Sequence, residues 1–319
     1  MIRGLDIFCG AGGSSAGARA AGIELRAGID MDLVATRTYQ DNFENAHVVT
    51  SRLEDINLND LRRQIGSIDI LLASPECTNH TCAKGSAPRS EESRATALTV
   101  VEYARAFKPR WLVLENVVQM RPWSRYGELK HELELLGYNL DEQVLDSQDY
   151  GVAQSRRRLF VVGDRAAKPH LVLHKNPGRK KSAASILDAD GVWPTTALNR
   201  PNRATDTLAR AERAFQTLGE ETPFLLVYYG TDGSGGWQPL TRPLRTITTV
   251  DRFALVTPGE TEPQMRMLQV SELRRAMGFD PNYLFQYGTR RDRVRLLGNG
   301  VCPPVMETVV RELTATSLS

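Results

Sequence analysis

Two polar side chains that can do chemistry follow directly after apolar runs in this chain of 319 residues. Cys77 follows the apolar residues 68–72 after a turn in which Pro75 ends the strand, and Glu115 follows the apolar residues 111–114. A thiolate can act as a nucleophile, and a carboxyl group can hold or release a proton. Ligands of open α/β sheets bind at the carboxyl ends of strands. A lone cysteine there would indicate an inert thiol, but the two strand ends together predict a site.

A run of three arginines leads into a further apolar strand that ends at Gly163. Neighbouring side chains of a strand point to opposite faces. Arg156 and Arg158 therefore share one direction, and Arg157 takes the other. On a surface loop the same run would be no more than solvated charge.

A glycine-rich turn, residues 9–13, follows the first apolar strand and precedes a helix of small residues. Strand, glycine turn and helix form the nucleotide-binding unit of doubly wound folds, although many tight turns need glycine for geometry alone. An acidic residue about twenty positions later usually accepts hydrogen bonds from ribose hydroxyls, and Asp30, followed by Met31, is in that position. Asp55, followed by Ile56, could accept from an adenine amino group or could instead cap a helix.

The glycine turn has neither the P-loop spacing nor the full dinucleotide fingerprint. A nucleoside without a pyrophosphate therefore fits it best, and S-adenosylmethionine is the cofactor that we expect.

Apolar strands and helical segments alternate through the first half of the chain. The predicted strands are residues 4–8, 24–29, 46–50, 68–72 and 111–114, and the predicted helices are residues 14–21, 91–107 and 126–136. This alternation is typical of a doubly wound, Rossmann-like α/β fold with a parallel sheet.

Composition limits the classes of protein. The net charge is +2, so any nucleic-acid partner must meet local basic patches. The cysteines lack the spacing of metal ligands, so we expect no metal, and they are few enough to indicate a reducing compartment: Cys9, Cys77, Cys82 and Cys302. No apolar run approaches membrane-spanning length, and the first residues predict a strand, not a signal peptide. We expect a cytoplasmic protein.

These pieces, in this order, resemble the cytosine-5 DNA methyltransferase family of bacteria and phages. The matching segments are residues 6–13, Cys77, 115–117, 154–158, 266–279 and 298–305. The resemblance implies a methyltransferase domain, residues 1–164 plus 262–319, that binds S-adenosylmethionine. It also implies that the C-terminal helix packs beside the N-terminal strand. The residues that it implies for the cofactor pocket, beyond Asp30 and its neighbours, are Phe8, Gly10, Gly12, Asn299 and Val301.

The resemblance further implies that a base is flipped out of duplex DNA into the site. Cys77 would add to carbon 6 of cytosine and Glu115 would stabilise the protonated ring nitrogen. Arg156 and Arg158 would position the base and its phosphate.

One departure falls on the segment Ser74-Pro75-Glu76-Cys77, because the family usually has proline directly before its cysteine. The segment also resembles the Ser-Pro-Pro-Tyr motif of enzymes that methylate exocyclic amino groups. In such an enzyme Ser74, Pro75 and Glu76 would matter more than Cys77, and adenine N6 would be the target. A transfer-RNA methyltransferase on the same scaffold is a third interpretation.

The middle segment, residues 165–261, interrupts the family pattern and is the expected target-recognition domain. It contains a predicted alternating strand, residues 224–229. A basic loop and a glycine-rich loop with an aromatic residue suit contacts to phosphates and to the grooves of DNA, although either could be an ordinary solvated loop. The candidate DNA-binding residues are Arg179, Lys180, Lys181, Gly235 and Trp237.

Overall fold

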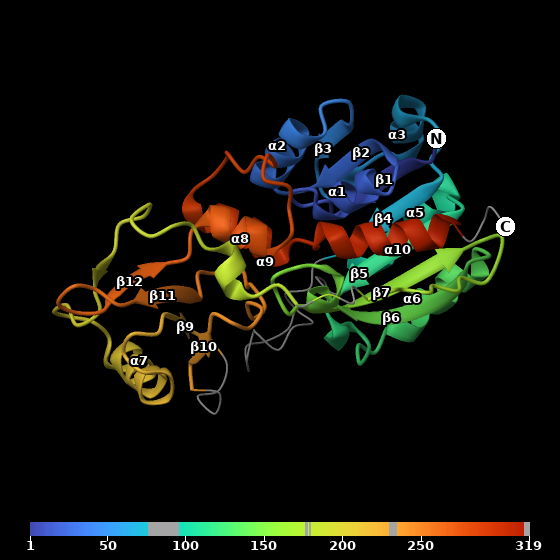
Figure 1. Cartoon of the computed structure of the whole chain (residues 1–319). Helices are drawn as coiled ribbons and strands as arrows, with labels where there is room; N and C mark the ends of the chain where they lie inside the picture. Colours follow the sequence, from blue (N-terminus) through green and yellow to red (C-terminus); the bar gives the residue numbers. More distant parts are fainter. Residues whose placement is uncertain (76–95, 176–177, 179, 230–234, 316–319) are drawn as a thin grey trace.

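The computed structural model describes residues 1–75, 96–175, 178, 180–229 and 235–315, and these form two lobes, each built on one sheet (Figure 1). The sheet of the first lobe has seven strands in the order β3-β2-β1-β4-β5-β7-β6. Strands β1 to β5 are parallel to one another, whereas β7 runs antiparallel to both β5 and β6. The chain order reverses between β1 and β4, which makes that point the topological switch of a doubly wound sheet. The predicted fold class is confirmed.

The strands of this sheet are β1 (Arg3–Ile7), β2 (Glu24–Asp30), β3 (His47–Thr50), β4 (Ile70–Ala73), β5 (Trp111–Asn116), β6 (Asn139–Asp146) and β7 (Arg157–Asp164). The helices of the first half are α1 (Gly13–Ala20), α2 (Leu33–Asn42), α3 (Leu58–Ile65), α5 (Thr99–Phe107) and α6 (Tyr126–Leu135). The C-terminal helices are α8 (Val270–Ala276), α9 (Arg290–Asn299) and α10 (Pro303–Ala315).

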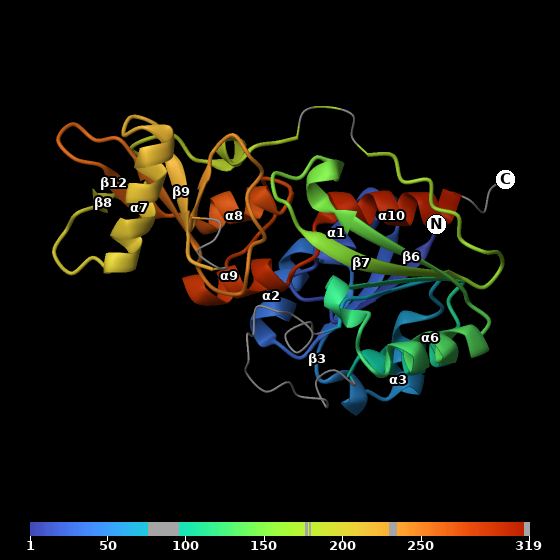
Figure 2. The same ribbon diagram turned by 90° about the horizontal axis from the view of Figure 1, so that it is seen from below.

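Helices cover both faces of the seven-stranded sheet, as Figure 2 shows. One face packs on α1, α2 and α10, and the other packs on α3, α5 and α6. Every residue of β4 and β5 is buried, which explains why both are continuous apolar runs rather than alternating ones. The C-terminal helix was expected beside the N-terminal strand, and helix α10 instead packs mainly on α1, the helix that follows that strand.

The second lobe is a five-stranded antiparallel sheet in the order β10-β9-β11-β12-β8. Its elements are β8 (Thr196–Ala197), α7 (Thr205–Leu218), β9 (Phe224–Val227), β10 (Trp237–Pro239), β11 (Phe253–Thr257) and β12 (Gln264–Met267). Helix α7 packs on one face, where Phe224 and Leu226 point. Leu225 and Val227 point the other way, into the apolar core of the first lobe. The two lobes therefore share one continuous core.

This burial contradicts the alternating strand predicted at residues 224–229. All four residues of β9 are buried, because α7 covers one face of the strand and the first lobe covers the other. Residues 91–95 of the helix predicted over 91–107 lie outside the described residues. From Thr96 the chain forms a 3₁₀ turn and then α5. Arg266 and Met267, which begin the matching segment 266–279, lie in β12, and helix α8 follows from Val270.

The second sheet extends past the boundary predicted at residue 261. Strand β12 pairs with β11 and β8, so residues 264–267 belong to the second sheet, and the chain enters the first lobe only at α8. Hydrogen-bonding partners decide to which sheet such a short strand belongs, and these are not visible in its own sequence. In the described parts of the chain no helix is long and apolar enough to cross a membrane.

The packing of β2 against α2 yields a stability test. A methyl group added at Gly28 would overlap the ring of Tyr39, which is fully buried and hydrogen-bonded to Ser15. We expect Gly28→Ala to lower the unfolding free energy by about 1–3 kcal/mol, because an overpacked core must shift. Gly127→Ala is the matched control, since a methyl group there meets nothing within 4 Å and Gly127 lies in α6. Thermal unfolding that ranks the two variants in the opposite order would contradict this packing.

Candidate functional site

The carboxyl ends of the central parallel strands meet at one edge of the first sheet. Strand β1 leads into the glycine turn, β2 ends at Asp30, β4 leads to Ser74 and Pro75, and β5 ends at Glu115 and Asn116. The order β2-β1-β4-β5 makes these ends neighbours, as the sequence predicted.

The glycine turn forms an open cradle beside Asp30. Gly10 has φ 53°, and a methyl group built on it meets nothing within 4 Å, so the space beside it is free for a ligand. The Asp30 carboxylate accepts hydrogen bonds from the backbone N–H groups of Gly10 (2.9 Å) and Asp32 (2.9 Å), which fix its orientation. Burial raises the pKa of Asp30, against the lowering effect of these two hydrogen bonds. Phe8 also has a positive φ of 56°, which is rare outside glycine and is found at functional turns.

The other two glycines of the turn are explained by packing. A methyl group on Gly12 would lie 2.5 Å from the hydroxyl oxygen of Tyr283 and 2.7 Å from the ring of Phe43. On Gly13 it would overlap the backbone of Val301. The structure thus brings Val301 against the glycine turn, whereas the aromatic core leaves no room for a side chain on Gly12.

The remaining predicted cofactor residues differ in exposure. Met31 directly follows Asp30 and is 67% exposed, which leaves an apolar side chain beside the cradle. Asp55 and Asn299 are exposed and Ile56 is half-buried. The alternative that Asp55 caps a helix is wrong, because the side chain of Asn57 caps α3 by accepting from Asn59 and Asp60.

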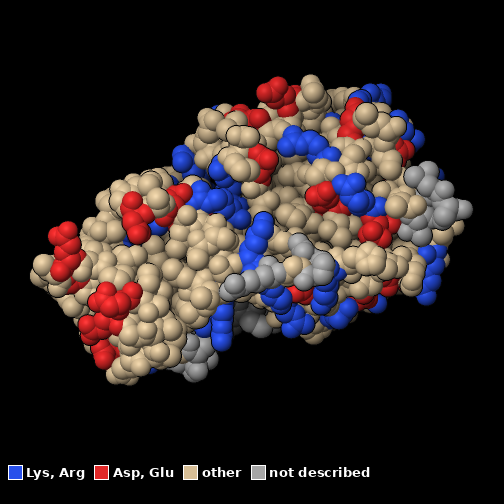
Figure 3. Space-filling view, in the orientation of Figure 1, with Lys and Arg blue, Asp and Glu red and all other residues tan. Residues whose placement is uncertain are grey.

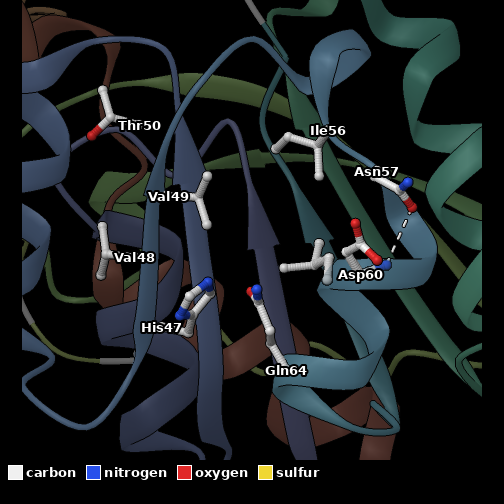
Figure 4. Close-up of a pocket in the computed structure, with 9 residues that line it drawn as sticks. His47, Val48, Val49, Thr50, Ile56, Asn57, Asp60 and Gln64 are labelled. Atoms are coloured by element: carbon white, nitrogen blue, oxygen red, sulfur yellow. Dashed lines mark hydrogen bonds between the residues drawn. The ribbon is translucent and has the colours of Figure 1, made fainter.

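A pocket of about 460 Å³ lies between β3 and α3 (Figure 4). Its lining residues are His47, Val48, Val49, Thr50, Ile56, Asn57, Asp60, Leu61 and Gln64. It shares only Ile56 with the predicted cofactor residues and includes neither Asp30 nor the glycine turn. The converging strand ends, not this groove, carry the candidate chemistry.

A buried polar chain beneath the glycine turn was not anticipated from the sequence. Asp6 is fully buried in β1 and accepts a hydrogen bond from the Ser15 hydroxyl at 2.7 Å, and that hydroxyl lies 2.7 Å from the Tyr39 hydroxyl. Among the described residues, Oδ1 of Asp6 has no hydrogen-bond partner. Burial raises the pKa of Asp6 to about 7, against the hydrogen bond from Ser15. One signal was available, since Asp6 is a carboxylate inside an apolar strand.

Glu115 and Arg158 form a buried ion pair at the end of β5. Arg158 Nε lies 3.2 Å from Glu115 Oε1, and the side chains are 14% and 7% exposed. Oε1 meets no aligned hydrogen-bond donor in the described ranges, so the contact is an ion pair only. Burial raises the pKa of Glu115, and the charges of Arg158 and then Arg156 oppose that rise. A buried carboxyl group with a raised pKa is a candidate for exchanging a proton with a ligand.

Asn116 connects the end of β5 to the segment that carries the cysteine. Its side-chain amide donates to the carbonyl oxygen of Pro75 at 3.0 Å, while its Oδ1 accepts from the N–H of Val117 at 2.8 Å. The hydroxyl of Ser74 lies 3.1 Å from that of Ser14 in α1. Glu76 and Cys77 lie outside the described residues.

Arg156 and Arg158 do point away from Arg157, as predicted, since Arg157 is exposed and the other two are wholly or largely buried. Their partners differ. Arg158 reaches Glu115, whereas Arg156 donates to backbone carbonyl oxygens of Ile247, Gly298 and Gly300. The structure thus brings only Arg158 into contact with the predicted acid.

The predicted DNA-binding residues are placed in two groups. Lys181 is exposed, and Lys180 is exposed but pairs with Asp149 at 3.1 Å, as Lys175 does at 3.0 Å. Arg179 lies outside the described residues. Gly235 and Trp237 are half-buried at the β10 hairpin, where Arg213 donates to the Gly235 carbonyl oxygen at 3.1 Å. Asp149, which the sequence did not single out, holds the basic loop to the first lobe.

No group of three or more histidine, cysteine, aspartate or glutamate side chains in the described ranges is arranged to hold a metal ion. Cys9 and Cys302 are buried as free thiols, and burial raises the pKa of both. Neither thiol has the low pKa that a reactive cysteine requires.

Comparison with known proteins gives a match over nearly the whole chain. The family model "C-5 cytosine-specific DNA methylase" matches residues 2–315. The Type II methyltransferase M.FnuDI of Fusobacterium nucleatum is 26% identical, with 98% of this chain and 94% of that protein covered. M.DdeI of Desulfomicrobium norvegicum is 29% identical over 52% of this chain, and the matched part spans only 41% of that relative.

Solved structures agree on the fold. A protein described as a candidate DNA modification methyltransferase encoded within an E. coli prophage superimposes with a TM-score of 0.72 at 17% identity, with both chains wholly covered. At this identity the likeness shows the fold alone.

The cradle yields a binding test. We expect Asp30→Ala to weaken S-adenosylmethionine binding by roughly 1–3 kcal/mol through loss of charge-assisted hydrogen bonds. Asp141→Ala is a matched control, because Asp141 is a half-buried aspartate in β6, at the far edge of the sheet from β2. Titration calorimetry on folded protein measures both variants. Equal affinity of Asp30→Ala and the parent protein would remove Asp30 from the site.

Proposed function

The chain belongs to the C-5 cytosine-specific DNA methylase family, and from that membership we propose that it methylates carbon 5 of a cytosine within a specific sequence of duplex DNA. The methyl donor is S-adenosylmethionine, and the site is the edge where β1, β2, β4 and β5 end. The observation that carries the proposal is the hydrogen bond from Asn116 to the Pro75 carbonyl oxygen. It joins the strand end bearing Glu115 to the segment that leads, two residues later, to Cys77.

The chemistry follows from what a thiol and a buried acid can do to a pyrimidine. The Cys77 thiolate adds to carbon 6, forming a carbon–sulfur bond and moving the electron pair of the 5,6 double bond to carbon 5 and the ring. Glu115 supplies a proton to the ring nitrogen N3, and its raised pKa suits that task. After carbon 5 has gained a methyl group, loss of its proton restores the double bond and expels Cys77. Glu76, directly before Cys77, is a negative charge that would raise the thiol pKa.

The cofactor pocket is assigned to residues of the cradle. S-adenosylmethionine, when bound, supplies an electrophilic methyl group. The empty side of Gly10 fits a ligand that approaches the backbone closely, and the oriented carboxylate of Asp30 fits a ribose. Phe8, Met31 and Ile56 are apolar side chains available to an adenine ring. The further residues assigned to the pocket are Gly12, Asp55, Asn299 and Val301.

The second lobe, whose sheet runs from β8 to β12, is assigned to reading DNA. In Figure 3 lysine and arginine side chains gather along the line where the two lobes meet, and acidic side chains gather on the outer end of the second lobe. The phosphates of a duplex bound where the two lobes meet would contact these lysine and arginine side chains. The target base then rotates out of the helix to reach Glu115 and Cys77. Gly235 and Trp237 belong to the reading loop, and Arg179, Lys180 and Lys181 belong to the phosphate contacts. Arg158 orients Glu115 and the base.

Two alternatives differ in substrate. Methylation of an adenine amino group, with Ser74, Pro75 and Glu76 as the reactive loop, finds no support in the comparisons. Transfer RNA is separated from duplex DNA by a direct methylation assay on both. Relatives named Type II methyltransferases support a role in restriction–modification, and we place the enzyme in the cytoplasm.

The nucleophile gives the sharpest test of the reaction. Cys77→Ser is expected to lower DNA methylation by at least on the order of a thousandfold, because the thiolate adduct is obligatory. Cys82→Ser, in the same segment, is the control and should keep its activity. DNA with 5-fluorocytosine at the target should trap the parent protein covalently, since fluorine cannot leave as the proton does. Persistent methylation by Cys77→Ser, with 6-methyladenine as the product nucleoside, would overturn the proposal.

The basic loop gives a separate test of DNA contact. Replacing Arg179, Lys180 and Lys181 by alanine should weaken binding and flatten its salt dependence, by about 0.9 in log–log slope for each phosphate that is no longer neutralised. Lys180 should contribute least, because it is already paired with Asp149. Sequence preference should hardly change. Lys130→Ala, which removes a lysine paired with Glu142 on the first lobe, is the control. A slope equal to that of the parent would make the loop an ordinary solvated one.

A further inference from the structure

Residues 244–248, which lie between β10 and β11 of the second lobe, are hydrogen-bonded to residues 153–156, which directly precede β7. Leu244 donates from its N–H to the Ala153 carbonyl oxygen at 2.8 Å, and Ser155 donates to the Leu244 carbonyl oxygen at 2.8 Å. The side chain of Gln154 accepts from the N–H of Ile247 at 2.8 Å. Thr246 donates through its hydroxyl to the Ser155 carbonyl oxygen at 2.9 Å. We call residues 153–156 and 244–248 the lobe seam.

Arg156 extends this seam to a third segment. Its side chain is buried, and the guanidinium donates to the carbonyl oxygens of Ile247 (3.0 Å), Gly298 (2.8 Å) and Gly300 (2.9 Å). Gly298 and Gly300 stand at the C-terminal end of α9, where carbonyl groups lack helical partners and a cation is favourable. A methyl group on Gly298 would overlap the backbone of Thr248, so the third segment touches the second lobe directly.

The same third segment reaches the cofactor cradle. Val301, next to Gly300, packs its backbone against Gly13 of the glycine turn. Two positions along the chain from Arg156, Arg158 pairs with Glu115. The buried Arg156 guanidinium therefore contacts both the second lobe and the backbone that borders the cradle, and it lies two residues along the chain from the partner of Glu115.

We propose that Arg156 is a positioning residue that couples occupancy of the cofactor cradle to the seating of the second lobe on DNA. The inference rests on the proposed function, because it needs both ligands. A ligand that orders residues 299–301 also fixes the Arg156 guanidinium, which binds the Gly300 carbonyl oxygen. The guanidinium in turn fixes the Ile247 carbonyl group and the lobe seam to which Ile247 belongs. Arginine suits this position because two separate nitrogen atoms of its planar guanidinium serve two segments, Nη1 for Ile247 and Nη2 for Gly298 and Gly300, whereas the three donors of lysine all belong to one nitrogen atom. By linkage, DNA must tighten cofactor binding by the same factor.

The experiment measures this coupling in the full-length protein. DNA affinity is determined with and without S-adenosylhomocysteine, on a duplex that carries the methylated sequence identified by nucleoside-resolved sequencing. In the parent we expect S-adenosylhomocysteine to tighten DNA binding on the order of tenfold, within the usual range of coupling between sites. In Arg156→Lys the ratio should fall to within about twofold. Arg157→Lys, the exposed neighbour, should keep the parent ratio.

Kinetics and a milder variant separate positioning from general damage. Arg156→Lys should raise KM for S-adenosylmethionine at saturating DNA with a smaller effect on kcat, whereas a partly unfolded enzyme would lose kcat alone. If Arg156→Lys does not fold, Thr246→Val removes one hydrogen bond of the lobe seam, and it should reduce the ratio without abolishing it.

The failures are distinguishable. A parent protein that methylates no DNA defeats the proposed function. An active parent whose two ligands bind independently, or an Arg156→Lys that keeps the parent ratio, defeats only the role of Arg156.

Discussion

The site depends on the burial of the central strands on both faces. Strands β4 and β5 lie between two layers of helices and have no exposed face, so their interiors must be apolar. Polar side chains of β4 and β5 are therefore found only at or beyond the carboxyl end of each strand. Parallel direction brings these ends to one edge, and Asp30, Ser74, Glu115 and Asn116 all stand there. The architecture thus concentrates side chains from distant parts of the sequence at a single edge.

The chain closes on itself across this edge. Helix α10 packs on α1, and the backbone of Val301 lies against Gly13, so the last segment borders the cradle that the first segment builds. A cradle completed in this way requires contacts between the first and last segments of the chain, which lie on either side of the inserted second lobe. The contacts that close it span almost the full sequence, which is the kind of topology that folds slowly. Asn42 in α2 and Leu284 exchange hydrogen bonds across a similar separation.

Much of this edge could be predicted because its signals are local. An apolar run followed by Asp30 or by Glu115 predicts both the strand and the residue at which it ends. The glycine turn predicts that another group approaches the backbone closely there. What could not be predicted depends on partners far away in the sequence. Leu225 and Phe224 are equally apolar, but the first lobe covers one and α7 covers the other. Arg156 and Arg158 look alike in sequence, yet one holds backbone carbonyls and the other an acid. In the sequence Lys180 resembles any solvated lysine, and only the structure shows that it pairs with Asp149.

Two buried carboxyl groups near this edge, Asp6 and Glu115, differ in the groups that surround them, and this difference suits them to different roles. Asp6 and Glu115 both have pKa values raised by burial. Asp6 accepts a hydrogen bond from Ser15, which suits a group that supports the turn rather than reacts. Glu115 has Arg158 at 3.2 Å, and that charge favours the ionised form which burial disfavours. Burial and the charge of Arg158 therefore act on the pKa of Glu115 in opposite directions, and burial is the larger of the two. In the proposed reaction Glu115 gives a proton to the ring and takes it back, and a neutral residue in place of Arg158 would leave burial to raise the pKa of Glu115 without that opposing charge.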